Sequence, residues 1–156
     1  MLNHPNVIAV RDALENAGAT VEITILSEAV HTAALAAAAL NIEVGQIANS
    51  LIFDADGEPL LVLTSGAHRV DTTRVATLLD ITKLRRATPE FVRLHTGQAI
   101  GGVAPLGHPK PVRTLIDVDL EQYSEVWAAA GVPQSIFPIT YAELVRVTAG
   151  TPATVA

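Results

Sequence analysis

A β-hairpin is the sequence feature that most restricts the fold of this chain. Two short apolar runs, residues 50–54 and 60–64, stand on either side of the dipeptide Asp56-Gly57. An Asp-Gly pair favours a tight hairpin turn because glycine adopts positive φ angles without a steric penalty. Apolar runs bounded by turn residues are typical of β-strands, so this segment predicts two antiparallel strands joined by a short turn.

The rest of the chain alternates irregularly between expected helices and strands. Capping residues, early prolines and terminating glycines predict helices over residues 5–18, 32–40, 72–79, 88–97 and 140–148. Short apolar or alternating stretches predict strands over residues 20–26, 83–86, 112–117 and 135–139. Residues 123–130 fit either a strand or a helix. This order predicts an α/β (α+β) fold in which helices flank a mixed β-sheet.

Length and composition support one folded domain. The chain has 156 residues, of which 49 % are hydrophobic and 17 % are charged. A chain of this size buries roughly 70 % of the surface of its unfolded state, and its apolar content is far above that of a disordered segment. We expect a single domain over residues 1–150 and a frayed tail over residues 151–156.

Composition also excludes several classes of protein. The absence of cysteine excludes disulfides, a thiolate nucleophile and cysteine-ligated zinc. The formal net charge is −6, and only Lys83, Arg85 and Arg86 cluster among the basic residues, so we expect no extended DNA binding. No two histidines have the spacing of a helical metal pair, and we expect no metal and no cofactor.

The longest apolar run and the amino terminus bear on location. Residues 33–40 form an apolar run of mostly alanine, far shorter than the ~18 residues that a membrane span needs. The amino terminus lacks a secretion signal, so we expect a cytoplasmic protein with no membrane partner. The small side chains of residues 33–40 leave two alternatives, packing in a homodimer or packing within the chain.

A glycine-rich stretch is the first candidate for chemistry. Residues 97–107 contain four glycines and Pro105, with no acidic residue. Glycine lets backbone N–H groups approach a ligand oxygen closely, which is how an oxyanion hole forms without charged side chains. The alternative is a buried loop in which the glycines only allow the backbone to turn.

These features together resemble a known family. The hairpin around Asp56-Gly57, then Gly66, then Gly101-Gly-Val-Ala-Pro105 and a strand ending at Asp117 are similar in order and spacing to the YbaK/EbsC family. The resemblance extends over residues 20–148. The fold of this family is also that of the editing insertion in bacterial prolyl-tRNA synthetases, which implies the same fold here.

The resemblance also implies an activity and a partner. Members of the family hydrolyse the ester of mischarged aminoacyl-tRNA, so the implied partner is the acceptor end of an aminoacyl-tRNA. Their glycine loop holds the aminoacyl carbonyl, and the matching residues are Gly101, Gly102, Val103, Ala104 and Pro105.

One position departs from the family pattern. A lysine early in the hairpin strand orients the tRNA end in the family, whereas this chain has Asn49 there. A neutral amide offers hydrogen bonds but no full charge. We therefore carry two hypotheses: a trans-editing deacylase for a small amino acid such as alanine, serine or cysteine, or a weakened or inactive binding module for an amino acid, nucleotide or protein.

Four further residues are candidates for substrate binding. Ser50 follows Asn49, while Gly66 and His68 follow the second hairpin strand and His108 follows the glycine loop. We expect all four near the cleft between the hairpin and the loop. For both histidines the alternative is an ordinary solvated loop residue.

Overall fold

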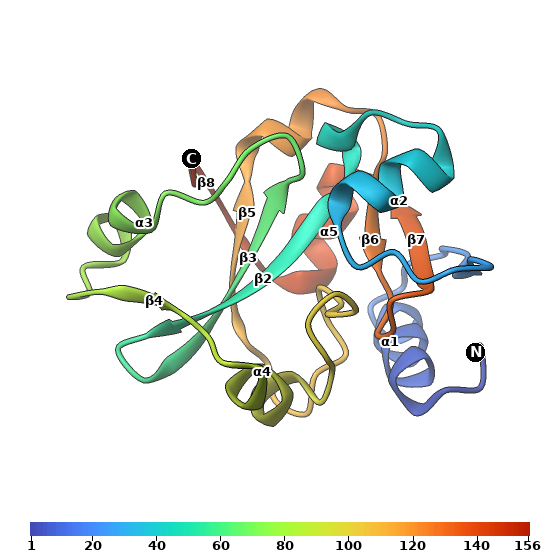
Figure 1. The fold of residues 1–156 in the computed structure, drawn as a ribbon, viewed down its shortest axis with the longest axis horizontal. Helices are drawn as coiled ribbons and strands as arrows, with labels where there is room; N and C mark the ends of the chain where they lie inside the picture. The colour runs from blue at the N-terminus through green and yellow to red at the C-terminus, as the bar shows by residue number, and fades with distance from the viewer.

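Two β-sheets organise the fold (Figure 1). The computed structural model covers residues 1–156. In the larger sheet, β2 (Ala48–Ala55) pairs antiparallel with both β3 (Glu58–Ser65) and β4 (Leu84–Arg86). On the other side of β3, β5 (Arg113–Asp117) and β8 (Thr151–Ala153) add parallel pairs. This sheet is mixed, as predicted, and its strand order is β4-β2-β3-β5-β8.

The smaller sheet has three antiparallel strands in the order β1-β7-β6. It contains β1 (Thr24–Ile25), β6 (Val126–Ala129) and β7 (Ser135–Ile139). The ambiguous stretch 123–130 is therefore a strand, whereas the strand expected over 20–26 is reduced to two residues. A bridge between Ile47 and Trp127 joins the start of β2 to β6, which brings the two sheets together.

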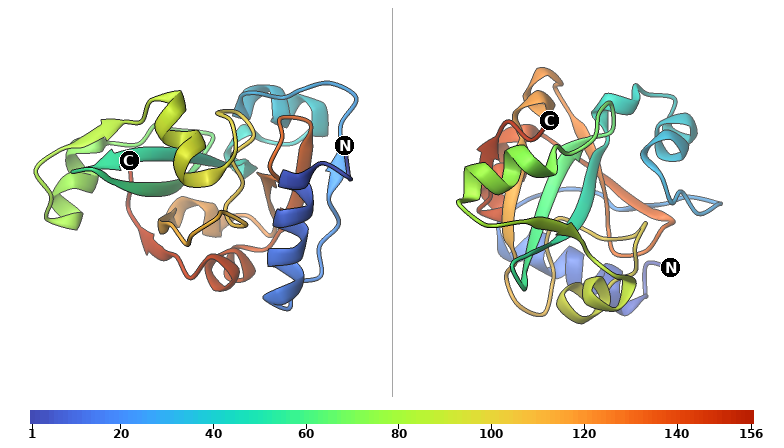
Figure 2. Two further views of the ribbon diagram at one scale, coloured as in Figure 1. Left: turned by 90° about the horizontal axis from the view of Figure 1, so that it is seen from below. Right: turned by 60° about the vertical axis from the view of Figure 1, so that its left-hand side comes forward.

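Five α-helices and two short 3-10 helices cover the sheets (Figure 2). They are α1 (Pro5–Asn16), α2 (Ala33–Leu40), η1 (Val44–Gln46), α3 (Thr72–Leu79), α4 (Pro89–Thr96), η2 (Val118–Gln122) and α5 (Tyr141–Thr148). Side-chain oxygens of Asp71, Thr88 and Thr140 accept N–H groups at the helix starts, as the capping patterns predict, and the Thr32 hydroxyl does the same for α2. No helix is long and apolar enough to traverse a bilayer.

The alanine-rich helix α2 packs within the chain. Ala36 and Ala37 form a small buried cluster with Ile47, next to the start of β2. Small side chains allow this helix to lie close to the strand that carries Asn49. Leu35 on the same helix is half exposed.

Strand β3 is buried on both faces. Leu61 and Leu63 belong to the main core, which also includes residues of α1, β6, β7 and α5. Leu60 and Val62 alternate with them and belong to a second core beneath α3. Successive side chains of a strand point to opposite faces, so one strand anchors both cores. Its neighbour β2 is thereby held on a rigid support.

The last six residues correct the expectation of a frayed tail. Strand β8 pairs with β5, and Val155 is completely buried in the second core. The carbonyl of Val155 also accepts the N–H of Asp71 at 2.7 Å, next to the start of α3. Sequence reasoning missed this strand because three residues with a central proline carry almost no strand pattern.

We predict that Val155→Ala destabilises the protein by about 2 kcal/mol, because a fully buried valine loses its apolar contacts and leaves a cavity. Urea unfolding measures the change. Val118→Ala is the matched control, since Val118 is exposed and should lose little. Equal effects of the two substitutions would contradict the ordered tail.

Candidate acyl-binding site

Strand β2 and the glycine loop form the walls of a small cavity. It has a volume of about 220 Å³ and is lined by Asn49 and Ser50 of β2, Gly101 and Val103 of the loop, and Trp127 of β6. Twelve of its 19 lining residues are hydrophobic, and none is Lys, Arg, Asp or Glu. We call this the small cavity. It lies between the hairpin and the glycine loop, where the sequence analysis expects a cleft.

A second cavity adjoins the first and shares part of its wall. This large cavity has a volume of about 480 Å³, and Asn49, Ser50 and Val103 line both spaces. Its remaining wall includes Arg69 and Arg86. Asn49 and Ser50 therefore lie at the junction of an apolar compartment and a larger compartment that carries positive charge.

Two polar side chains of β2 lack partners at this junction. The Ser50 hydroxyl is buried and makes no hydrogen bond. The half-buried side-chain amide of Asn49 makes no hydrogen bond within the chain, although its backbone pairs with Thr64 on β3. Buried polar groups are normally paired, and an unpaired hydroxyl in a cavity is expected to bond to a ligand or to water.

The glycine loop supplies two free amides rather than four. The N–H of Gly102 donates to the Ala99 carbonyl at 3.0 Å, and the N–H of Ala104 donates to Gln98 Oε1 at 2.8 Å. The N–H groups of Gly101 and Val103, both of which line the small cavity, have no acceptor within the chain. The expectation that the whole motif offers amides is thus corrected: two of its amides stabilise the loop itself.

Glycine is required at the two consecutive positions 101 and 102 for different physical reasons. Gly101 adopts φ +93°, which other residues rarely tolerate, and its backbone lies against His31. A Cβ on Gly102 would come within 2.8 Å of Val132 Cα and 2.9 Å of Pro133 N. Close packing explains Gly102, as in the alternative interpretation of a buried loop, whereas Gly101 carries a free amide.

The last residue of the motif lies outside the site. Pro105 has no N–H, and it lines a different cavity together with His108. The imidazole of His108 bonds to the Ala104 carbonyl at 2.8 Å, and burial lowers the pKa of His108. These positions correct the expectation that Pro105 and His108 lie at the cleft.

Gly66 supports the site without lining either cavity. A Cβ at this position would meet the Val44 carbonyl oxygen at 2.4 Å, so only glycine fits. Its N–H donates to the carbonyl of Ile47, just before β2. This contact fixes the start of the strand that carries Asn49.

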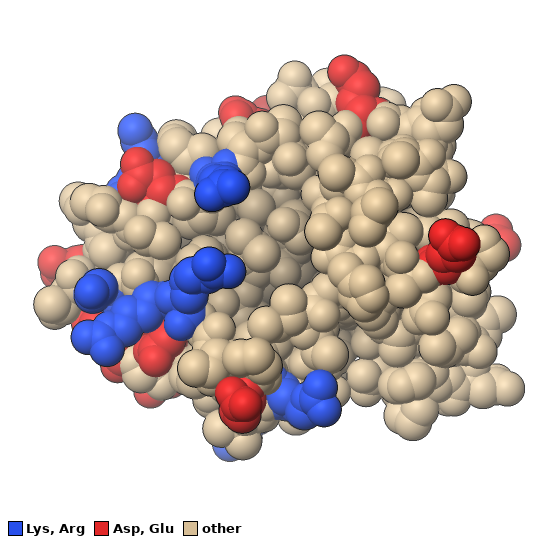
Figure 3. Space-filling view, in the orientation of Figure 1, with Lys and Arg blue, Asp and Glu red and all other residues tan.

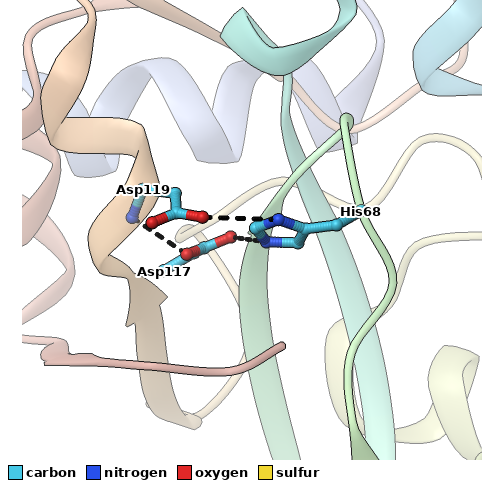
Figure 4. A group of neighbouring side chains, drawn as sticks. All are labelled: His68, Asp117 and Asp119. Atoms are coloured by element: carbon cyan, nitrogen blue, oxygen red, sulfur yellow. Dashed lines mark hydrogen bonds and ion pairs between the residues drawn. The ribbon is translucent and has the colours of Figure 1, made fainter.

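His68 lines the large cavity and belongs to a cluster that the sequence did not reveal. Figure 4 shows both aspartates on the same side of its ring, with Nε2 bonded to Asp117 and Nδ1 3.4 Å from an Asp119 oxygen. Asp117 is 1 % exposed and also accepts the N–H groups of Ser65 at 2.9 Å and Asp119 at 3.0 Å. The buried carboxylate therefore ties the loop after β3 to the end of β5.

The same three side chains offer metal-ligating atoms within 4.8 Å of one another. Two of these atoms, His68 Nε2 and an Asp117 oxygen, already bond to each other. The geometry is that of a carboxylate that orients a histidine. Histidine spacing alone could not find this cluster, because Asp117 lies 49 positions after His68 in the sequence.

Gln98 is a positioning residue that the sequence did not indicate. Its side chain is 2 % exposed, and it holds the Ala104 amide inside the glycine loop. Thr96 in turn accepts the Gln98 N–H at 3.0 Å. A buried glutamine in a loop has no periodic signal, so only the fold identifies its role.

The structure thus combines a mixed α+β fold with a small, largely apolar cavity that is lined by residues with unpaired amides. Comparison with known sequences and structures specifies the class. The sequence profile of the aminoacyl-tRNA editing domain matches residues 27–147. This chain belongs to the aminoacyl-tRNA editing domain family. The family resemblance and the fold expected from it are confirmed.

The chain is also similar to several known proteins. A structure of a proposed trans-editing enzyme for prolyl-tRNA synthetase is 41 % identical, with a TM-score of 0.90 over 97 % of this chain and 96 % of that one. The uncharacterised protein YwhH of Bacillus subtilis is 28 % identical over 79 % of this chain and 78 % of its own length. Proline–tRNA ligase of Levilactobacillus brevis is 31 % identical over 60 % of this chain, which spans only 16 % of the ligase.

We predict that Gln98→Ala lowers the unfolding free energy by about 1–3 kcal/mol, because it leaves the buried Ala104 amide without an acceptor. The same substitution should weaken ligand binding in the small cavity, since the loop loses its internal brace. Urea unfolding measures the first effect. Gln122→Ala serves as control because Gln122 is exposed. An equal loss of unfolding free energy in both variants would refute a stabilising role for the Gln98–Ala104 hydrogen bond.

Proposed function

We propose that this chain hydrolyses the ester between a small amino acid and a tRNA, acting in trans on tRNA that prolyl-tRNA synthetase has mischarged. Membership of the editing-domain family supports the reaction. Similarity along nearly the full length of a proposed trans-editing enzyme supports action on a separate substrate molecule. The prolyl-tRNA synthetase connection also fits the relatives among the proline–tRNA ligases.

One observation carries the proposal: unpaired hydrogen-bonding groups border a single small cavity from two elements. The Asn49 amide and the Ser50 hydroxyl come from β2, and the N–H groups of Gly101 and Val103 come from the loop. All of these groups can bond to a carbonyl oxygen or a water molecule. If the loop were closed and purely structural, its N–H groups would be bonded within the chain and would not be available at the cavity.

The chemistry makes modest demands on the protein, because an aminoacyl ester is already activated. Water adds to the carbonyl carbon, the bond from that carbon to the ribose oxygen breaks, and the ribose oxygen takes up a proton. The free amides of Gly101 and Val103 stabilise the negative charge that develops on the carbonyl oxygen. Asn49 and Ser50 orient the ester and the attacking water. No side-chain nucleophile takes part.

The size and lining of the small cavity support a small amino acid as the acyl group. A cavity of about 220 Å³ with a largely apolar lining holds a short side chain, and Trp127 and Ile136 occupy part of its wall. Alanine, serine and cysteine satisfy this limit.

The second candidate is a binding module that retains the fold with little or no hydrolysis. One observation favours it: Asn49 is neutral and stands where the family resemblance places a lysine. Charge-assisted hydrogen bonds are roughly twice as strong as neutral ones, so this site lacks one source of transition-state stabilisation. Turnover separates the two candidates directly.

The test is deacylation of a panel of tRNAs mischarged with alanine, serine or cysteine, compared with buffer. We predict release above the buffer rate, and a loss of ~10²-fold in kcat for Asn49→Ala, the size of effect expected when the reacting groups are no longer held in place. Asn16→Ala is the control, since Asn16 is exposed at the end of α1.

Asn49→Lys adds a second comparison. Faster hydrolysis by the Asn49→Lys variant would show that asparagine supports the reaction less well than lysine. Slower hydrolysis would show that the asparagine amide has a role of its own. Release at the buffer rate for every substrate would refute the deacylase and support the binding module.

A further inference from the structure

We propose that the large cavity binds the phosphodiester backbone at the 3′ end of a single RNA strand, through Arg69 and Arg86. This inference rests on the proposed function, since it assigns the place of the nucleic acid next to the acyl site. It assigns two arginines, which sequence reasoning did not include among the site residues, to substrate binding.

Charge is the first observation. The chain has 16 acidic and 10 basic residues, yet no Asp or Glu lines the large cavity. Arg69 and Arg86 are exposed at its wall, and neither forms an ion pair. Figure 3 shows basic side chains gathered along one side of a central hollow, while the opposite side carries none. Two unpaired guanidinium groups favour a ligand with more than one negative charge.

The two arginines approach the cavity from different elements. Arg69 follows His68, whose bond to Asp117 fixes the loop after β3. Arg86 lies on β4 directly opposite Phe53 of β2, and both line the cavity. Side chains of directly opposite residues share one face of a sheet, so Arg86 faces the same side as Phe53. The cavity therefore has a cation on each of two separate supports.

The adjoining small cavity fixes the direction of the ligand. The two spaces share Asn49, Ser50 and Val103 in their walls, and their volumes are about 220 and 480 Å³. A small acyl group fits the first, and a nucleotide needs a space of the size of the second. An ester that joins the two parts then lies at the shared wall, beside the unpaired Asn49 amide. Phosphates further along the strand lie toward Arg69 and Arg86.

A free nucleotide offers the same phosphate chemistry from another source. It carries one phosphorylated site, whereas an RNA strand carries a phosphate at every step. Only the strand can contact both arginines through separate phosphates, and the two sources therefore differ in the number of counterions that binding releases.

The experiment measures binding of an uncharged tRNA acceptor minihelix at several salt concentrations. We predict that Arg69→Gln and Arg86→Gln each weaken binding about three- to fivefold. Each should also make the negative slope of log K against log[salt] less steep by about 0.7, the value for one phosphate contact on a single strand. In the double variant the slope should become less steep by about 1.4. Arg86→Lys should retain most of the slope because it keeps the charge.

Arg85→Gln is the matched control. Arg85 is the neighbour of Arg86 on the same strand, is also exposed, and lies opposite Asp54 in the strand register, on the other face of the sheet. A slope that changes as much in Arg85→Gln as in Arg86→Gln would overturn the proposal. So would binding of adenosine monophosphate alone that depends on both arginines as strongly as binding of the minihelix, since it would indicate a free nucleotide.

Kinetics separate this inference from the proposed function. Aminoacyl adenosine carries the ester without any phosphate, so the two arginine variants should hydrolyse it at the wild-type rate and show a raised KM only with aminoacyl minihelix. Hydrolysis of both substrates at unchanged KM in the variants would overturn the arginine site and leave the deacylase intact. The converse result is a wild type that releases no amino acid while the arginine substitutions still weaken salt-dependent binding of the minihelix. That result would overturn the deacylase and support the RNA site.

Discussion

The contact between the backbone at Gly102 and the segment Val132–Pro133 is the constraint on which the site depends. A single added carbon at residue 102 would come within 2.8 Å of Val132, so the loop reaches its position only through glycine. Gln98 braces the other side of the loop by accepting the Ala104 amide. With these two contacts made, the N–H groups of Gly101 and Val103 remain unpaired beside β2.

The opposite wall owes its rigidity to the packing of β3. That strand is buried on both faces, and its full-length pairing with β2 sets the register that places Asn49 opposite Thr64. Binding groups on a rigid strand hold their geometry better than groups on a mobile loop. Beyond β2, the buried Asp117 carboxylate holds His68 and the loop that carries Arg69. One sheet therefore positions both the acyl compartment and the charged compartment.

Local sequence signals predicted the hairpin, the capped helices and the glycine loop, because each depends on a few adjacent residues. The Asp56-Gly57 turn and the cap at Asp71 are of this kind. Features that depend on contacts between distant parts of the chain were not predicted. Residues 151–153 become a strand only because β5 offers a free edge, and His108 turns away from the site to bond to the Ala104 carbonyl. Motif spacing marked the glycine loop but could not show which of its amides stay free.

Amide NMR of the protein with a non-hydrolysable aminoacyl adenosine, in which an amide replaces the ester, tests the central claim most directly. The Gly101 and Val103 backbone N–H signals and the Asn49 side-chain NH₂ signals should shift on binding and become protected from hydrogen exchange. The signals of Gly102 and Ala104, already bonded within the loop, should keep their free-state protection. Binding of the analogue without any change at Gly101, Val103 and Asn49 would contradict the account.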